Sequence, residues 1–511
     1  MAQRHRRRLF VARTGRGAER TAAESLSEAL GGLPLAHEQG AAYCERLDIS
    51  LGEYCKRFEA TPARFLYDAR HAPAEYHDGL TVGKTFALAI EEAAKQHPAA
   101  GPLIVHAALL APEPIPLFLF AEAREKFGEP LATALADDGL DEAVAALRAF
   151  ALVDRERITD ERDASITTDA IRLHRLVREV AAARREGASD LLRRALVAAL
   201  AAVYPDDGYS NPTSWPRCAS LTPHLLASCE TATADAAANA ECADLLNRAG
   251  EYFHGRAVYS GARPLLERGL AVREKVLGPE HPDTATSLHN LAFLLQAQGD
   301  LAGARTLCER GLAIREKVLG PERPDTAKSL NNLALVLQGH GDPAGARPFF
   351  ERALAICEKV LGPEHPNTAM SLHNLALVLR TQRDPAGARP LFERALAISE
   401  KVLGPEHPDT ATSLSNLALV LQAQGDLAGA RPLLERALAI KEKMLGPEDS
   451  YTALSLNHLA LLLQDQGDFA GALAHYERAL AIYEKVLGFE HPDTDRVRAA
   501  VLRARSRGGE G

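Results

Sequence analysis

The chain has 511 residues, of which 46% are hydrophobic and only 5% aromatic, with a single tryptophan. This length predicts two to four domains, and cores built mainly from Leu, Ala and Val are typical of helical proteins. The formal net charge of −9 argues against nucleic-acid binding by the protein as a whole.

The cysteines and the hydropathy of the chain indicate where in the cell the protein is found. The seven cysteines form no CxxC pair and have no regular spacing, which is typical of thiols in a reducing cytoplasm, so we expect a cytoplasmic protein. No apolar run reaches about 18 residues without a charge or a helix breaker, so no membrane span and no membrane partner are expected. The apolar stretch of the basic start, MAQRHRRRLFVAR, is too short for a secretory signal.

The part of the chain before residue 236 contains no repeat but several recognisable elements. Residues 32–36 read GLPLA, and Pro34 suits the first turn of a helix, where no backbone N–H is needed. Residues 81–120 read as two amphipathic helices. Residues 140–157 and 166–184 then read as helix, strand, hairpin strand and helix, which is a winged-helix pattern.

This succession resembles the C-terminal part of an NB-ARC module, from the STAND class of signalling NTPases, over about residues 8–185. The resemblance implies that Pro34 lies against adenine. It also implies that His174, in a Leu173-His174-Arg175 match to the MHD motif, reaches the ADP β-phosphate. Arg175 replaces the Asp of that motif. ADP or ATP is therefore the ligand that the resemblance implies, although we predict no cofactor for this chain.

The parts needed for ATP hydrolysis are missing from the sequence. The nearest string to a phosphate-binding loop, Gly79–Thr85, is one residue short between its glycines and falls in a predicted helix, Thr81–Ala93. No Walker-B run precedes GLPLA. We therefore predict that the chain is not an enzyme, and we interpret it as a truncated form whose NTPase activity would need an upstream domain.

Two loop-like stretches follow, and then one phrase recurs at a fixed interval. Tyr204–Arg217 reads as a loop and Thr231–Ala238 as a linker rich in Ala and Thr. A fixed period over half a chain predicts stacked supersecondary units. The phrase KVLGPEHPDT and its variants lie at Lys275–Thr284, Lys317–Thr326, Lys359–Thr368, Lys401–Thr410, Lys443–Thr452 and Lys485–Thr494.

Each unit reads as a helical hairpin. In the clearest unit, Asp409 is the predicted N-cap of a first helix and Gly425 follows its last turn. Asp426 is the predicted cap of a second helix, which Gly446 and Pro447 end. The apolar spacing predicts these buried residues in the two helices: Leu414, Leu417, Ala418 and Leu421, then Leu434, Ala437, Leu438 and Leu445.

The period alone also fits HEAT and armadillo repeats, which run to about 40–47 residues. Propellers fit by length, but the helical periodicity and the lack of strand runs exclude them. The L-x-N-L-A and E-R-A-L wording closely resembles the tetratricopeptide repeats of kinesin light chains, over about residues 240–505. Six helix pairs are predicted, with second helices at Pro264, Thr306, Pro348, Pro390, Pro432 and Ala474, and Asp495–Arg505 as a capping helix.

A second stripe on the first helices is the candidate binding surface. The resemblance places these helices on the concave side and their Asn in a peptide groove, where a carboxamide can donate and accept at once. The alternative is that each Asn bonds to a neighbouring repeat and each Leu is simply buried. The stripe comprises Asn290, Asn332, Asn374 and Asn416; Phe293, Leu335, Leu377 and Leu419; and Gln296, Gln338, Arg380 and Gln422, with His458, Leu461 and Gln464 in the next unit.

Other repeated residues indicate no chemistry. The Glu-Arg pairs, such as Glu351/Arg352, read as a solvated surface. The turn histidines His281, His365, His407 and His491 sit in separate units, too far apart to share a metal ion, so no metal site is expected.

The predicted fold class is mainly α, with a tetratricopeptide solenoid preceded by a helical bundle and a winged-helix-like domain. The predicted boundaries are a helical remnant over 1–75, helices and winged helix over 76–185, a helical linker over 186–239, six pairs over 240–491, and a cap and tail over 492–511. We expect a scaffold that binds a protein or peptide. A STAND-type ADP/ATP switch is the alternative. A winged-helix transcriptional regulator is the second alternative, raised by Arg172, Arg175, Arg178, Arg184 and Arg185, although nucleic acid is an unlikely partner.

Overall fold

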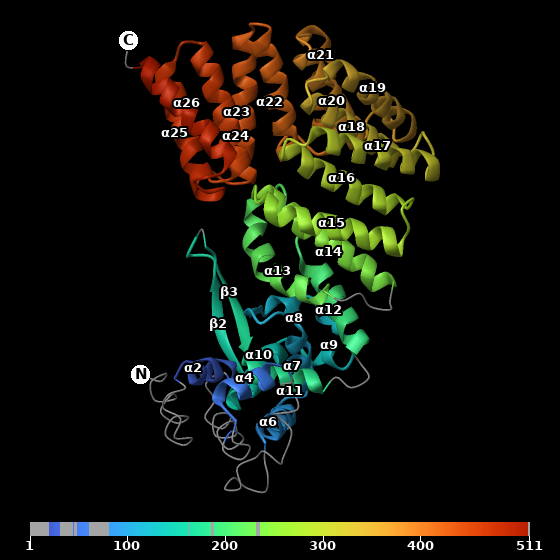
Figure 1. The fold of residues 1–511 in the computed structure, drawn as a ribbon. Helices are drawn as coiled ribbons and strands as arrows, with labels where there is room; N and C mark the ends of the chain where they lie inside the picture. Colours follow the sequence, from blue (N-terminus) through green and yellow to red (C-terminus); the bar gives the residue numbers. More distant parts are fainter. Residues whose placement is uncertain are drawn as a thin grey trace. The chain divides into compact units, whose positions relative to one another are not determined.

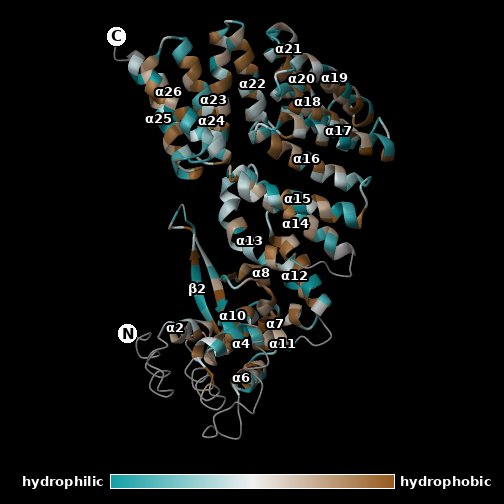
Figure 2. Cartoon of the chain, in the orientation of Figure 1, coloured by the Kyte–Doolittle hydropathy of each residue, from teal (hydrophilic) through white to brown (hydrophobic). Residues whose placement is uncertain are grey.

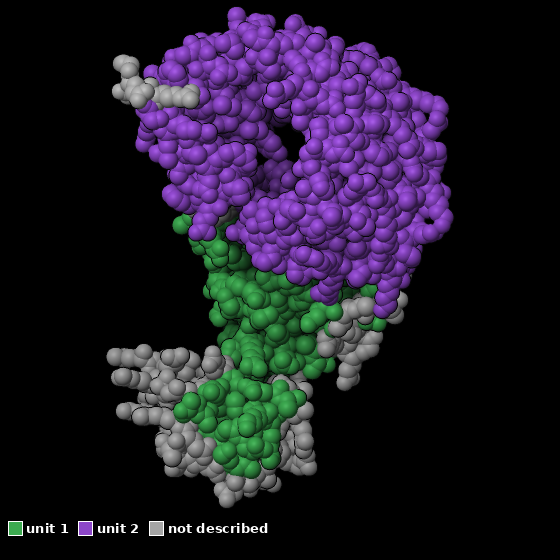
Figure 3. Space-filling model, turned by 45° about the horizontal axis from the view of Figure 1, so that its top comes forward, with its two compact units in different colours: residues 1–205, 216–245 green, residues 206–215, 246–511 purple. Residues whose placement is uncertain are grey.

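The structure is a computed structural model and describes residues 20–30, 44, 49–60, 81–161, 163–184, 189–230 and 236–508. Its contacts divide the chain into two units, residues 1–205 with 216–245 and residues 206–215 with 246–511 (Figures 1 and 3). None of the helices in the described ranges has the length and hydropathy needed to span a membrane. The predicted fold class is confirmed, whereas the predicted domain boundaries stay predictions.

Unit 1 is helical with one small sheet. Leu103, Phe120, Leu147 and Ile171 are fully buried and form part of its core. The elements up to Ser228 are α2 (Arg20–Ala29), α4 (Leu51–Ala60), α6 (Val82–Gln96), α7 (Ala100–Leu109), β1 (Ile115–Pro116), α8 (Phe118–Glu122), η3 (Arg124–Phe127), α9 (Leu131–Ala134), α10 (Gly139–Ala149), β2 (Val153–Thr159), β3 (Thr167–Leu173), α11 (Arg175–Ala183), α12 (Ser189–Val203), η4 (Pro212–Ser214) and α13 (Trp215–Ser228).

The sheet has the order β1-β3-β2 and is antiparallel throughout. The hairpin pairs Val153 with Leu173 and Thr159 with Thr167, and the two-residue β1 joins its other side through Ile115 and Ile171. Helix α10 precedes the hairpin and α11 follows it, as the winged-helix pattern predicted. Strand β1 was not predicted, because so short a strand shows no alternating pattern.

Unit 2 is built from helix pairs, and from α15 (Tyr259–Val276) onward each helix packs against the next along the chain (Figure 1). Apolar and polar residues interleave along every helix, as Figure 2 shows. The six pairs and the final helix are α14 (Ala236–Gly255) with α15 (Tyr259–Val276), α16 (Pro282–Ala297) with α17 (Leu301–Val318), α18 (Pro324–Gly339) with α19 (Pro343–Val360), α20 (Pro366–Thr381) with α21 (Pro385–Val402), α22 (Pro408–Ala423) with α23 (Leu427–Met444), α24 (Ser450–Asp465) with α25 (Phe469–Val486), and α26 (Pro492–Gly508).

The recurring phrase forms the turn between consecutive pairs. Its glycine has a positive φ, +96° at Gly404, which ends the second helix in a conformation that favours glycine. Its threonine is fully buried, and the Thr410 hydroxyl donates to the Gly404 carbonyl at 2.8 Å. The same bond recurs from Thr284, Thr326, Thr368, Thr452 and Thr494. The phrase therefore fixes how one pair leads into the next.

Two predicted details of the clearest unit are wrong. The N-cap of α22 is His407, whose Nδ1 accepts from the backbone N–H of Asp409, because Pro408 already occupies the first helical position. Leu445 is 38% exposed, because it is the C-cap residue, beyond the last turn that faces the core. The other predicted core residues of this unit are buried, and Asp426 caps α23 as expected.

Candidate functional site

The predicted stripe lies on α16, α18, α20 and α22, and all twelve of its residues are half-buried. None of them is part of the fully buried core. Half-burial holds a side chain in place while leaving part of it accessible to a partner. Leu335 also packs on the buried cluster that contains Phe350, and Leu377 packs on the one that contains Phe392. These two leucines of the stripe are therefore held in place by the core.

The outer two asparagines of the stripe are engaged within the array. The Asn290 carboxamide donates to Glu251 Oε1 at 2.5 Å, and burial raises the pKa of Glu251 to about 7. The Asn416 carboxamide donates to the Thr412 carbonyl of its own helix at 3.0 Å. These two asparagines therefore form hydrogen bonds within the array, as in the alternative to peptide binding.

The two central asparagines differ. In the part of the chain that the structure describes, no hydrogen bond is found for the carboxamides of Asn332 and Asn374. They occupy the same position in adjacent units, on α18 and α20. Each is followed one turn later by a half-buried leucine, Leu335 and Leu377. Two carboxamides with unused donors and acceptors therefore lie side by side with two apolar surfaces.

The third position of the stripe links neighbouring units. The Gln338 carboxamide donates to Thr381 Oγ1 at 3.1 Å, and the Gln422 carboxamide donates to Asp465 Oδ2 at 2.6 Å. Gln296 makes a longer contact of 3.4 Å with the Leu335 carbonyl. Arg380 is the exception, because it is half-buried and pairs with no carboxylate within the described ranges. Burial lowers the pKa of its guanidinium.

A ladder of buried polar side chains was missed in the sequence. It lies on the second helices, where Arg315 Nη1 donates to the Asp325 carbonyl at 3.0 Å and to Ser329 Oγ at 3.1 Å. Residue type changes from unit to unit at this position, while its neighbours stay constant. That variation is the signal that could have revealed it. The ladder comprises Arg273, Arg315, Cys357, Ser399, Lys441 and Tyr483.

The repeated Glu-Arg pairs lie on an exposed surface but do not bind each other. Glu351 accepts from Arg347 of its own helix at 2.7 Å, whereas Arg352 pairs with Glu316 of the preceding second helix at 2.7 Å. A further ladder joins Lys359 to Glu322 at 2.6 Å. Such exposed ion pairs contribute little stability each, about 0–1 kcal/mol, but they repeat at every junction.

The turn histidines act as helix caps. Nδ1 of His281, His365, His407 and His491 accepts from the backbone N–H two residues later. In the variant KMLGPEDSYT at Lys443–Thr452, the Asp449 carboxylate does the same. Among the described residues, no group of three or more potential ligands is placed to hold a metal ion.

Of the two predicted nucleotide residues, the structure describes only His174. Pro34 lies outside the described residues, and Nδ1 of His174 accepts from the Leu176 N–H to cap α11. The string Gly79–Thr85 makes no phosphate loop in its described part, because Thr81 caps α6 and Gly83 is buried within that helix.

The basic residues of the winged helix are largely occupied. Arg178 donates to the carbonyls of Ala107, Ala108 and Ala111, and burial lowers the pKa of its guanidinium. Arg172 pairs with Glu156 at 3.0 Å, and Arg184 pairs with Glu91. A surface that contacts phosphates would keep these cations exposed and available.

Family models for the tetratricopeptide repeat match the repeat region. One matches residues 241–301, 286–359, 341–400 and 372–443, and a second matches residues 452–493. The array is a tetratricopeptide repeat array. A search of the curated proteins finds no match.

Several solved structures are similar to the chain. The nearly identical TPR-like repeats of a Podosopora anserina protein described as a kinesin light chain are 34% identical over 40% of this chain and 97% of theirs, with a TM-score of 0.35. BtubC (BKLC) from P. vanneervenii is 24% identical over 46% and 92%, with a TM-score of 0.37. A STAND protein with a tetratricopeptide repeat sensor from Pyrococcus horikoshii is 13% identical over 93% of this chain and 62% of that protein, at a TM-score of 0.52, which is a likeness of fold alone.

Proposed function

We propose that this protein is an interaction scaffold whose tetratricopeptide array binds an extended segment of a partner protein along the Asn–Leu stripe. The observation that carries the proposal is the pair Asn332 and Asn374, whose carboxamides have no hydrogen-bond partner within the described ranges. The match of residues 241–443 and 452–493 to tetratricopeptide repeat models also supports the function of an interaction scaffold. A cytoplasmic location fits the seven cysteines, all of which are buried and none of which forms a disulfide.

The central stripe has the chemistry of a peptide clamp. Each carboxamide can donate to a peptide carbonyl and accept from a peptide N–H, which gives affinity without sequence preference. Leu335 and Leu377 offer shallow apolar surfaces for alternate side chains of the bound segment. Arg380, which has no carboxylate partner in the described part of the chain, favours a segment with an acidic residue at that point.

A double substitution tests this proposal. Peptides selected by display on the full chain would be measured by fluorescence polarisation against Asn332→Ala/Asn374→Ala. Losing two hydrogen-bonding groups costs about 1–3 kcal/mol, so we expect binding to weaken roughly fivefold to 150-fold. The matched control is Gln298→Ala/Gln424→Ala, which removes two exposed carboxamides away from the stripe. Equal affinity of the double variant and the wild type would exclude the stripe as the binding surface.

A STAND-type switch is the second candidate, because the likeness to the Pyrococcus horikoshii protein spans 93% of this chain. Such a switch would bind ADP or ATP through Pro34 and His174, with a phosphate loop supplied from elsewhere. Residues 81–85 do not supply that loop, because Thr81 caps α6 and the residues after it belong to the helix. Thermal denaturation with and without ADP and Mg²⁺ separates the candidates, since a scaffold shows no shift in melting temperature.

A further inference from the structure

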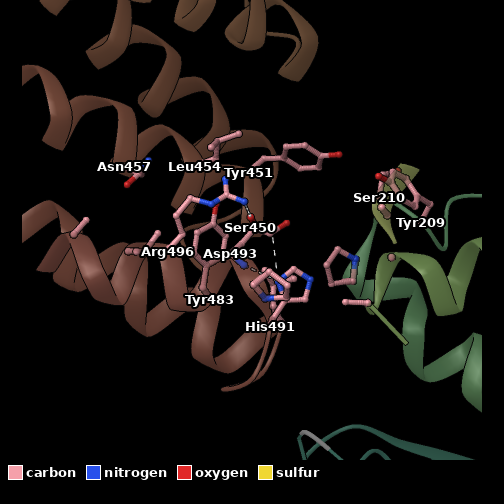
Figure 4. A pocket seen from close by; sticks show the side chains of 18 of the residues that line it. Tyr209, Ser210, Ser450, Tyr451, Leu454, Asn457, Tyr483, His491, Asp493 and Arg496 are labelled. Atoms are coloured by element: carbon pink, nitrogen blue, oxygen red, sulfur yellow. Dashed lines mark hydrogen bonds and ion pairs between the residues drawn. The ribbon is translucent and has the colours of Figure 1, made fainter. Parts of the chain in front are cut away.

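A cavity of about 680 Å³ lies within unit 2 (Figure 4). Leu461 and Gln464, which continue the stripe in the last helix pair, are part of its lining, but the central residues Asn332 and Asn374 are not. Its volume is in the range of small-molecule sites, about 300–1,000 Å³. None of the twelve stripe residues lines it. One wall comes from residues 209–215 and from α14 and α15, and the other from α24, α25 and α26. The inference below therefore goes beyond the proposed function.

Aromatic residues gather at this cavity in a chain that has few of them. Of the 11 tyrosines in the sequence, five line it, together with the single tryptophan. The rings of Tyr209 and His254 lie 4.9 Å apart, and those of His254 and Tyr259 lie 5.8 Å apart. Tyr209 and Tyr451 are 54% and 40% exposed. Ring faces of this kind bind flat apolar groups.

The repeat pattern breaks at the residues that form the second wall. Tyr451 stands where earlier units have Asp283, Asp325, Asn367 and Asp409, and Tyr483 stands where they have Arg, Cys, Ser or Lys. Leu454 and Tyr476 also differ from every earlier counterpart. All four line the cavity. These departures are not needed to build a repeat, because the other units pack without them.

The polar groups of the lining are mostly hydrogen-bond donors. Its only carboxylate, Asp493, pairs with Arg496 at 2.7 Å. Arg503 has no carboxylate partner among the described residues, and its Nε donates only to a carbonyl of its own helix. Burial raises the pKa of Tyr476 and Tyr483, so their hydroxyls stay protonated and can donate at neutral pH. The cavity therefore lacks a negative group to complement these donors.

We propose that this cavity binds a ligand that joins an aromatic ring to a carboxylate, with the ring against the tyrosines of the lining and the carboxylate at Arg503. Such a ligand is either a free aromatic acid or the C-terminus of a peptide that ends in an aromatic residue. Both present the same chemistry to the cavity. The volume accommodates either one.

The only tryptophan provides the measurement. Trp215 lines the cavity and is 2% exposed, so its fluorescence responds to changes at this wall of the cavity. The full chain, excited at 295 nm, would be titrated with N-acetyl-L-phenylalanine, with its uncharged amide, and with a tetraglycyl-phenylalanine peptide. We expect both carboxylates to change the emission, and the amide to bind about fivefold to tenfold more weakly, because it loses a charge-assisted hydrogen bond. Preference for the free acid or for the peptide identifies the source.

Variants make the assignment specific. Arg503→Gln and Tyr451→Asp are each expected to weaken binding of the carboxylate probes about fivefold or more. Tyr451→Asp restores the residue of the preceding unit, so it keeps the fold if Arg503→Gln does not. The matched control is Arg505→Gln on the same helix, since Arg505 pairs with Glu477 and does not line the cavity.

The outcomes separate this proposal from the peptide stripe. Equal binding of acid and amide, or no emission change with any probe at millimolar concentration, overturns it. The Asn332→Ala/Asn374→Ala variant is expected to keep full binding of the probes, because neither residue lines the cavity. The proposal for the cavity and the proposal for the stripe can therefore be confirmed or excluded separately.

Discussion

Lys441 is a buried cation in the fifth helix pair of the array, and replacing it with methionine should stabilise the protein. Its side chain belongs to the buried polar ladder of the second helices and is 2% exposed. Its ammonium lies 5.6 Å from the centre of the Tyr451 ring. Burial lowers the pKa of Lys441 from 10.5 to about 8, although Asp449 and Asp409 act in the opposite direction.

The cost of burying this charge follows from the two pKa values. The gap between 10.5 and about 8 corresponds to about 3–4 kcal/mol, because each pH unit is worth about 1.4 kcal/mol. Since the folded pKa lies below the unfolded one, stability falls as the pH drops from about 10.5 to about 8, and the full cost is present at pH 7. The neighbouring His458 stays neutral across this range, because burial lowers its pKa to about 4.

Urea unfolding of the wild type and Lys441→Met, followed by circular dichroism at pH 7, 9 and 10.5, measures this cost. Methionine has a similar volume and carries no charge, so we expect the variant to be more stable by up to about 3–4 kcal/mol at pH 7. The difference should shrink as the pH rises toward 10.5. Other titrating groups cancel, because both proteins are compared at each pH. A less stable variant at pH 7, or a difference independent of pH, would refute the reasoning.

Two further predictions concern the turn and the first helix pair. Thr410→Val removes the buried hydrogen bond to the Gly404 carbonyl and should destabilise the array by about 1 kcal/mol, seen as a lower melting temperature; an unchanged melting temperature would contradict this. Burial raises the pKa of Glu251 from 4.5 to about 7, so its protonation contributes stability that is complete below about pH 4.5 and is lost as the pH rises through 7. Urea unfolding of Glu251→Gln should therefore lack the fall in stability between pH 5 and 8, and persistence of that fall would point to another group.

The repeat could be predicted in detail because its signals are local. A glycine after a second helix and an Asp before it indicate where that helix ends and begins. The spacing of the apolar residues indicates which face of the helix is buried. Leu445 was wrongly predicted to be buried because the apolar spacing of the helix was extended to a residue beyond its end. Outside the helix, that spacing no longer indicates which way a side chain points. His407 was missed as the cap because Asp409, two residues later, is the commoner capping residue.

The candidate site was predicted less completely, for a different reason. The stripe positions follow from helical spacing, but which asparagines remain available depends on neighbours in the adjacent repeat, such as Glu251 beside Asn290. The cavity could not be predicted at all, since Tyr209 and Tyr451 lie far apart in the sequence. Only the accumulated curvature of six helix pairs brings two such walls together, and no local pattern encodes curvature.

The Lys–Glu ladder between units has a consequence for how this protein can evolve. Lys359 meets Glu322, Lys401 meets Glu364 and Lys443 meets Glu406 with nearly the same geometry. Duplicating or deleting one whole repeat would recreate the same junction, so chain length can change in whole steps without a misfit. The same step would shift the two walls of the cavity relative to each other. A change in the number of repeats therefore has little effect on folding. It does change the binding of any ligand that contacts both ends of the array.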